Sequence, residues 1–293
     1  MKQGAFWGIL WLKQKNWKGA VKVEKHLLFL DLDGTLLDDS KQISSGNRRA
    51  LEGALARGHG VVIATGRPLK GAMHQARSLG LDKPGCFLAA YNGGVIYDWG
   101  TGKQLCRKGL DKATVGEIFD YVNRKGLHIQ TYDRESVVVE SRCDNALVRE
   151  YCGTGIVQFR VIGDVRRDLT ELPVKILVID PDRQVLERLR QELAEKLDSR
   201  ADIFFSSSTY LEIVAAGVNK GEAVKMLSKL LAVPLKNTVA VGDEANDLSM
   251  IRTAGLGAAM ANATAEVKAA ADYITKRDNN RDGVAEVVEL FLQ

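Results

Sequence analysis

The sequence predicts an α/β fold, in which a parallel sheet carries helices on both faces and a second α/β domain is inserted into the chain. Two observations predict it. Short apolar runs, typical of buried parallel strands, alternate with segments whose apolar residues recur at helical spacing. Between residues 97 and 207 this alternation gives way to hairpin-like pieces mixed with helices, which indicates an inserted domain.

The framework strands are predicted at residues 26–31, 60–65, 86–91 and 238–241, and its helices at 45–57, 69–79 and 220–231. Each strand is short and apolar throughout, because a parallel strand buried on both faces has no polar side. The insert contains one clearly marked helix, "DPDRQVLERLRQELAEKL", with Asp180 as N-cap and Pro181 at the first helical position. It follows the apolar run "VKILVI", so we expect the insert to have a small sheet of its own.

Composition places the chain among ordinary globular proteins. It has 293 residues, 45% hydrophobic and 27% charged, which is enough for two domains or one large one. No apolar run approaches the roughly 18 residues that a membrane-spanning helix needs. The net charge of +4 comes from residues 1–26, which hold six lysines and one glutamate and leave a net charge of −1 for the rest. No basic patch with interleaved aromatics follows, so a nucleic-acid partner is not expected.

Residues 1–24 differ in composition from the rest of the chain. Three of the four tryptophans fall in this segment. Its apolar stretch at 5–12 is short for a signal peptide and lacks an evident small-residue cleavage site. We expect a passive extension or a start codon assigned too early, with a membrane-surface anchor as the alternative.

The cysteines and histidines give no sign of a catalytic or metal site. Cys86, Cys106, Cys143 and Cys152 form no C-x-x-C pair, and we expect reduced thiols in a cytoplasmic protein. Cys143 and Arg149 have the C-x5-R spacing of cysteine-dependent phosphatases, but the interval "DNALV" has no glycine and continues as helix, so it cannot cradle a phosphate. The four histidines lack metal-ligand spacing and are expected to be structural.

Four polar stretches lie in the framework: "DLDGT" at 31–35, "ATGRP" at 64–68, "GVNKGEA" at 217–223 and "VGDEANDLSM" at 241–250. Three of them end predicted strands. Ligands of open α/β sheets bind beyond the carboxyl ends of the strands, so these stretches are expected to converge on one crevice.

Four carboxylates would meet there, from Asp31, Asp33, Asp243 and Asp247. Asp31 and Asp33 point to the same side of a strand end, where two like charges are unfavourable without a cation. Oxygen ligands without histidine or thiol favour Mg²⁺ over zinc. The crowding of carboxylates therefore predicts a magnesium site.

The same crevice has the groups that bind a phosphate dianion. Lys220 starts a helix, Thr65 ends a strand, and Gly66 places N–H groups at a helix N-terminus. No serine, cysteine or histidine constellation offers a nucleophile, which leaves Asp31 or Asp33. An aspartate with a pKa near its ordinary value of about 3.9 is ionised and suits a nucleophile, while a neighbour repelled by it can be held protonated as an acid. On this argument Asp31 is the nucleophile and Asp33 the general acid, later base.

The four stretches, in this order, resemble the motifs of the haloacid dehalogenase-like phosphohydrolase superfamily. "YNGGVIYD", "AAMANA" and "YITKRDNNRDGVAEVVELF" resemble its Cof-type branch, and the likeness covers residues 25–293. It implies a Rossmann-like catalytic core formed by 25–96 and 208–293, with an α/β cap domain inserted at 97–207.

The resemblance also implies roles for individual residues. Asp31 would be the nucleophile and Asp33 the acid and base. The metal ligands would be the Asp31 side chain, the Asp33 backbone carbonyl and the Asp243 side chain, with Asp247 in support. Phosphate would be held by Thr65, Gly66, Lys220 and Asn246, and the substrate edge would include Arg67, Asn92 and Gly93. Structural roles stay open for Lys220 as a solvated helix-start lysine, for Asp247 as a helix cap and for Asn92 and Gly93 as a turn pair.

We therefore expect a Mg²⁺-dependent phosphatase that hydrolyses small phosphorylated metabolites, such as sugar phosphates or phosphorylated cofactors, through an aspartyl-phosphate. The alternatives are a phosphomutase or phosphotransferase with the same nucleophile, and a phospho-accepting signalling protein. The acid at Asp33 argues against the last, because a receiver has no leaving group to protonate.

Overall fold

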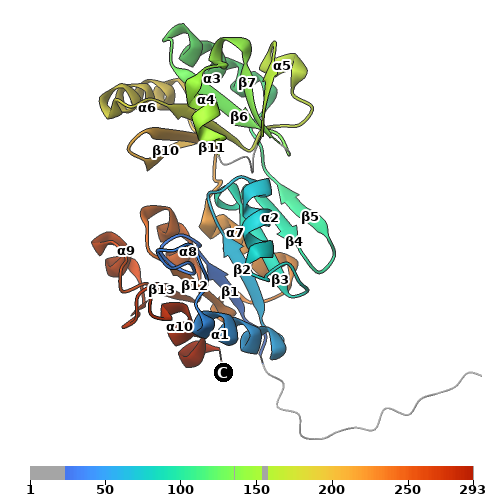
Figure 1. The fold of residues 1–293 in the computed structure, drawn as a ribbon, viewed down its shortest axis with the longest axis vertical. Helices are drawn as coiled ribbons and strands as arrows, with labels where there is room; N and C mark the ends of the chain where they lie inside the picture. The colour runs from blue at the N-terminus through green and yellow to red at the C-terminus, as the bar shows by residue number, and fades with distance from the viewer. Residues whose placement is uncertain (1–23, 135, 154–157, 293) are drawn as a thin grey trace, which may run out of the picture.

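The computed structural model describes residues 24–134, 136–153 and 158–292, which form two sheets with helices packed on them (Figure 1). The larger sheet has eight strands in the order β14-β13-β12-β1-β2-β3-β4-β5. Its parallel strands are β1 (Leu27–Leu30), β2 (Gly60–Ala64), β3 (Cys86–Ala90), β12 (Thr238–Gly242), β13 (Leu256–Ala259) and β14 (Tyr273–Ile274). The hairpin of β4 (Val95–Asp98) and β5 (Lys103–Arg107) extends one edge in antiparallel fashion.

Helices cover both faces of this sheet. Leu28 and Leu30 of β1 belong to the same apolar cluster as buried residues of α1 (Ser45–Ala56), α2 (Leu69–Ser78) and α10 (Gly283–Phe291). Leu27 and Phe29 point the other way, into a cluster with α7 (Lys220–Leu230). α8 (Leu248–Thr253) packs against α7, and α9 (Ala265–Ala270) against β13. The predicted α/β fold with a parallel-sheet core is thus confirmed, and its strand and helix positions differ from the expected ones by a residue or two.

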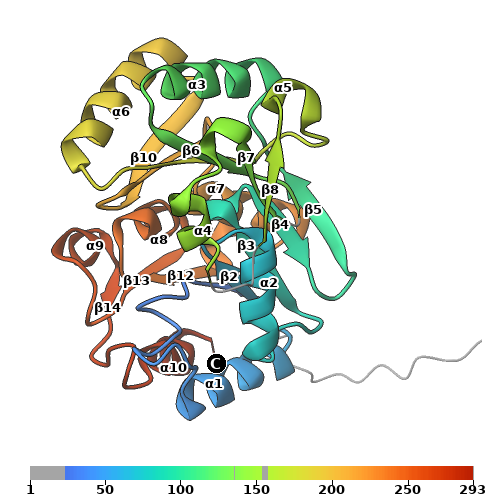
Figure 2. The same cartoon turned by 45° about the horizontal axis from the view of Figure 1, so that its top comes forward.

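The smaller sheet has the order β10-β11-β9-β6-β7-β8. Its strands are β6 (His128–Tyr132), β7 (Ser136–Glu140), β8 (Gln158–Ile162), β9 (Lys175–Ile179), β10 (Ala201–Ser207) and β11 (Tyr210–Ala215). The helices α3 (Lys112–Arg124) and α6 (Arg183–Leu197) cover the face that points away from the larger sheet (Figures 1 and 2). α4 (Ala146–Tyr151) contacts the smaller sheet through Tyr151, whose ring packs edge-on against that of Tyr132 in β6, and α5 (Val165–Asp168) packs against α3.

Strand pairing moves both limits of the insert from the expected 97 and 207. β4 pairs with β3, so the hairpin that follows residue 94 belongs to the core sheet. β11 pairs with β9 and β10, so it belongs to the smaller sheet. A hairpin has the same sequence pattern whether it extends an old sheet or starts a new one, which explains the difference. We call residues 108–215 the cap and the remainder of the described chain the core.

Two local expectations inside the cap have clear outcomes. The N-cap of α6 is Asp182, whose side chain accepts the N–H of Gln184, and the prediction of Asp180 was wrong. Asp180 instead accepts the N–H of Asp182 in the turn before the helix. Arg149 lies in α4, as expected, and pairs with Asp144 rather than forming a phosphate loop with Cys143.

Among the described helices, none combines the length and the apolar character that crossing a bilayer requires. The expectations for residues 1–24 concern a segment of which residues 1–23 lie outside the described residues.

Candidate active site

The loop after β1 is fixed against the loop after β12. Gly34 has φ +83°, and a Cβ at this position would overlap the carboxylate of Asp243, so only glycine fits. Thr35 Oγ1 donates a hydrogen bond of 2.7 Å to Asp243 Oδ1. Thr35 was not among the expected site residues. These contacts hold the "DLDGT" loop and Asp243 side by side, as the convergence of strand ends predicts.

Three buried carboxylates meet around one buried lysine. Oxygen atoms of Asp31, Asp243 and Asp247 all lie within 4.8 Å of one another. The ammonium group of Lys220, which is fully buried, lies 2.5 Å from Asp31 Oδ1 and 2.6 Å from Asp247 Oδ1. Lys220 is therefore not a solvated surface lysine, and the cluster has three acidic groups for one cation.

The pKa values of Asp31 and Asp243 are raised, as expected for buried carboxylates with too few cations beside them. Burial raises the pKa of Asp31 to about 7, which Lys220 opposes and the charge of Asp247 reinforces. Burial also raises the pKa of Asp243 to about 6, although the hydrogen bond from Thr35 opposes it. Burial lowers the pKa of Lys220, but the two carboxylates outweigh this and raise it, so the lysine stays charged.

The oxygen atoms left over in this cluster suit a hard divalent cation. Asp247 has none to spare, because Oδ1 accepts from Lys220 and Oδ2 accepts the backbone N–H groups of Asp243 at 2.9 Å and Glu244 at 3.1 Å. Among the described residues, no hydrogen bond reaches Oδ2 of Asp31 or of Asp243. These two oxygens could hold a cation directly, with Asp247 as support, and oxygen donors of this kind are typical of Mg²⁺ sites.

Cation binding at this cluster should weaken in acid. Protons compete with a metal for the carboxylates, and the raised pKa values of about 7 for Asp31 and about 6 for Asp243 place that competition near neutrality. We expect the Mg²⁺ affinity, measured by isothermal titration calorimetry, to fall at least ~10-fold between pH 8 and pH 5.5. The Asp243→Asn variant should bind weakly at both pH values. Equal affinity of the unaltered protein at both would contradict the assignment.

Asp33 points away from the carboxylate cluster. Its carboxylate pairs with Arg67 Nη2 at 2.8 Å and with Lys41 Nζ at 2.8 Å. Partial burial raises the pKa of Asp33, but these two cations more than offset it and lower the pKa below its ordinary value. In this state Asp33 is ionised and Asp31 has the raised pKa, which is the reverse of the protonation expected from the sequence. The spacing of the motifs gives no sign that Arg67 and Lys41 would reach Asp33.

A cavity of about 670 Å³ opens above Asp31, between core and cap. Thr65 directly follows β2 and is 2% exposed, and its hydroxyl accepts the backbone N–H of Arg67 at 3.2 Å. Asn92, buried with φ 55°, lies 3.5 Å from the amide of Asn246. Of the expected site residues, those that line the cavity are Asp31, Asp33, Thr65, Gly66, Arg67, Asn92 and Asn246.

The other expected residues do not line this cavity. Lys220, Asp243 and Asp247 are buried next to Asp31, in contact with it or with one another. Gly93 has φ +96°, and its Cα packs so close to the backbone carbonyl of Asn219 that a side chain would collide with it. Gly93 therefore packs against the beginning of α7.

The cap contributes lining residues that the sequence did not identify, among them Tyr151, Lys175 and Glu212. A signal was present for two of them. Lys175 begins the otherwise apolar strand β9 and Glu212 lies inside the largely apolar strand β11, where a buried charge is unfavourable unless it is paired or used. Their partners could not be assigned, because β9 and β11 are joined by a whole helix and a further strand.

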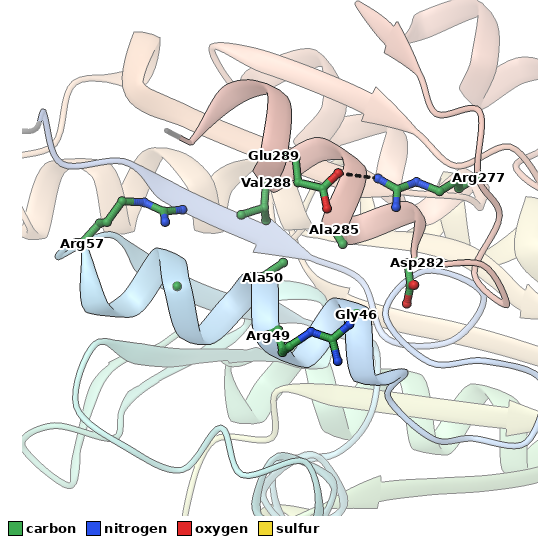
Figure 3. Close-up of a pocket in the computed structure, with 10 residues that line it drawn as sticks. Gly46, Arg49, Ala50, Arg57, Arg277, Asp282, Ala285, Val288 and Glu289 are labelled. Atoms are coloured by element: carbon green, nitrogen blue, oxygen red, sulfur yellow. Dashed lines mark hydrogen bonds and ion pairs between the residues drawn. The ribbon is translucent and has the colours of Figure 1, made fainter.

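A larger cavity, of about 750 Å³, lies between α1 and α10 at the end of the core remote from the cap (Figures 1 and 3). Arg277 pairs there with Glu289 at 2.7 Å, and Arg49 and Arg57 line the same space. None of the expected site residues lines this cavity. The candidate site is therefore identified by the carboxylates and other polar groups that line the smaller cavity, and not by the volume of the cavity.

Known proteins resemble this chain over most of its length. A family model described as haloacid dehalogenase-like hydrolase matches residues 28–288. The 5-amino-6-(5-phospho-D-ribitylamino)uracil phosphatase YcsE of Bacillus subtilis is 34% identical over 266 residues, covering 91% of this chain and 95% of the relative. A haloacid dehalogenase-like hydrolase from Bacteroides thetaiotaomicron superposes with a TM-score of 0.81 at 34% identity, covering 91% of this chain and 99% of that structure. A Thermotoga maritima protein superposes with a TM-score of 0.78 at 32% identity, covering 90% and 97%.

Proposed function

The chain belongs to the haloacid dehalogenase-like hydrolases, and from this premise we propose that it hydrolyses small phosphomonoesters through a phosphorylated Asp31. The observation that carries the proposal is the position of Asp31. Its carboxylate lies on the floor of the cavity, paired with the buried Lys220 and close to Thr65 and Asn246, which line the same space. This is where a phosphate dianion would place its phosphorus.

Mg²⁺ is the proposed cofactor, held by Asp31 and Asp243 with support from Asp247. When bound, it would neutralise negative charge on the phosphoryl group. The remaining binding is done by the chain itself. Thr65 and the backbone at Gly66 can donate to phosphate oxygens, and Asn246 lies across the cavity from them.

The reaction has two half-reactions at one aspartate. In the first, an oxygen of Asp31 attacks phosphorus, the ester P–O bond breaks, and the leaving alcohol takes a proton from Asp33. In the second, Asp33 accepts a proton from a water molecule that attacks the phosphorus. The bond between phosphorus and the Asp31 oxygen breaks, which frees the Asp31 carboxylate and releases inorganic phosphate. A phosphate dianion entering the cavity competes with Asp33 for Arg67. Loss of this partner raises the pKa of Asp33, so that it takes up the proton the first half-reaction needs.

The relatives support a small substrate. The name of YcsE describes the removal of phosphate from a ribityl chain attached to a pyrimidine. By extension, we propose sugar phosphates or phosphorylated cofactors as substrates of this chain. A cavity of about 670 Å³ is of the size that holds such molecules.

Hydrolysis can be separated from phosphoryl transfer to another substrate by following phosphate. We expect steady release of inorganic phosphate from a panel of monoesters with Mg²⁺ alone, without a bisphosphate primer. In heavy-oxygen water, solvent oxygen should enter the phosphate and none should enter the alcohol, because water attacks phosphorus. Dependence on a primer would identify a mutase, and label in the alcohol would exclude the mechanism.

A further inference from the structure

The roof of the cavity contains a buried ion pair that phosphoryl transfer does not require. Lys175 on β9 and Glu212 on β11 are 3% and 4% exposed, and Lys175 Nζ lies 2.8 Å from Glu212 Oε1. They are the charged residues that the described part of the cap contributes to the lining. The other cap residues there are aromatic apart from one serine: Tyr151, Phe204, Phe205, Ser206 and Tyr210.

One acceptor of this pair is unused. Glu212 Oε2 is buried and has no hydrogen-bond partner among the described residues. A carboxylate oxygen left in this way is costly to the folded protein, and such atoms are rare unless a ligand or water completes them. Lys175 is better satisfied, because it also donates to the carbonyl of Gly66 at 3.3 Å and lies over the ring of Tyr132. The atom of this ion pair that still lacks a partner is therefore a hydrogen-bond acceptor, Glu212 Oε2.

A donor lies in the same lining. The amide of Gln130 donates to the Tyr132 hydroxyl at 3.2 Å, and the Tyr132 hydroxyl donates to that of Tyr151 at 2.8 Å. The Tyr151 hydroxyl oxygen is therefore the acceptor at the end of this row of hydrogen bonds. Its own proton can point elsewhere, and no described residue accepts that proton. Tyr151 lines the cavity. The roof thus offers an acceptor and a donor beside flat aromatic side chains, with no net charge on the ion pair.

We propose that Glu212, Lys175 and Tyr151 form the subsite for the leaving group, and that it selects uncharged, hydroxyl-bearing leaving groups over those with a second anion. This inference rests on the proposed function. A hydroxyl group of the leaving group can donate to Glu212 Oε2 and accept from Tyr151 or Lys175. It would thereby supply the hydrogen-bond partners that Glu212 Oε2 and the Tyr151 hydroxyl lack. A carboxylate or second phosphate would instead bring a negative charge against Glu212 Oε2 in a buried site, where like charges repel strongly.

The test uses matched substrates that differ in one terminal group. Alditol phosphates of four to six carbons carry a terminal CH₂OH, and the corresponding aldonate phosphates carry a carboxylate at that position. We expect the unaltered enzyme to favour the alditol phosphate by about 100-fold or more in kcat/KM at one or more chain lengths. The reason is that the carboxylate of the aldonate phosphate would be repelled by the buried carboxylate of Glu212. Equal rates for the two members at every length would overturn the inference.

The Glu212→Gln variant should change the selectivity rather than only the rate. It should lower kcat/KM for the alditol phosphate and raise it for the aldonate phosphate, reducing the ratio to about 10-fold or less. A merely structural Glu212 would lower both together. Glu195→Gln, on the exposed surface of α6, is the matched control and should keep the original ratio. If Glu212→Gln does not fold, the double variant Lys175→Met with Glu212→Gln removes both charges and should show the same loss of selectivity.

Phenyl phosphate separates the two proposals, because its leaving group has no hydroxyl chain to recognise. Absence of phosphate release from phenyl phosphate and from every other ester would overturn the proposed function, and this inference with it. Release from phenyl phosphate, together with an alditol-to-aldonate ratio that Glu212→Gln leaves unchanged, would overturn the subsite alone.

Discussion

The Asp31→Asn variant should lose phosphatase activity by about 10⁴-fold or more in kcat, because an amide cannot form the phosphorylated intermediate. The substitution keeps the size of the side chain, so the fold should persist. The metal-free variant should even be as stable as the parent or more stable at pH 8. Burial raises the pKa of Asp31 to about 7 in the folded protein, so the cost of ionising Asp31 builds up between its ordinary pKa of about 3.9 and about 7 and is fully present at pH 8, and the amide removes this cost.

Single-turnover phosphate release and thermal unfolding at pH 8 would measure both parts of this prediction. Asp98→Asn, at the end of β4, where the side chain accepts the N–H of Gly100, is a matched control and should retain activity. Substantial turnover by Asp31→Asn would transfer the role of nucleophile to another residue. A large fall in its unfolding temperature would instead indicate that Asp31 is mainly a structural partner of Lys220.

The Lys220→Met variant should be both less stable and nearly inactive. Removing one partner of a buried ion pair leaves uncompensated charge, which typically costs about 3–5 kcal/mol, and here two carboxylates lose their cation. Lys220 also lowers the pKa of Asp31, so its removal should raise that pKa further and shift the acid limb of the pH–rate profile to higher pH. We expect a loss of at least ~10³-fold in kcat at pH 7, because Asp31 is then largely protonated and cannot attack phosphorus.

Lys225→Met provides the control for Lys220→Met. Lys225 lies on the same helix, but it is exposed and pairs with Glu222 at 2.7 Å. Loss of such a surface pair costs about 0–1 kcal/mol. Chemical denaturation of the metal-free proteins would compare the two. Equal stability of Lys220→Met and Lys225→Met would show that the buried cluster does not depend on its lysine.

The strands and helices of the core could be predicted from the sequence, because each of them has a pattern within a short stretch of residues. The strands before Asp31, Thr65 and Asp243 are short apolar runs, and the rule that parallel strands end at one edge then brings these residues together. The pairing of Asp33 with Lys41 and Arg67 was not predictable in this way. It depends on side-chain directions in a loop, and it reverses the protonation that like-charge repulsion alone suggests.

The cap was harder for a related reason. Its insertion and its own sheet were foreseen, but its limits were not, because sheet membership depends on pairing partners rather than on pattern. Lys175 and Glu212 stand 37 positions apart in the chain and meet only because β9 and β11 are neighbours in the sheet. Contacts of this type follow from topology, which must be known before the lining of the cavity can be described.

The chain leaves the core after Arg107 and returns after Ala215, a few residues before Lys220 begins α7. Asp31, Asp243, Asp247, Lys220 and Thr65 all lie outside that interval. On the proposed mechanism, variation within the cap would therefore alter which molecule is admitted while the reacting groups stay as they are. Gene duplicates of such a protein would then diverge toward new metabolites through changes in the cap alone, with the proposed phosphoryl-transfer centre retained in each.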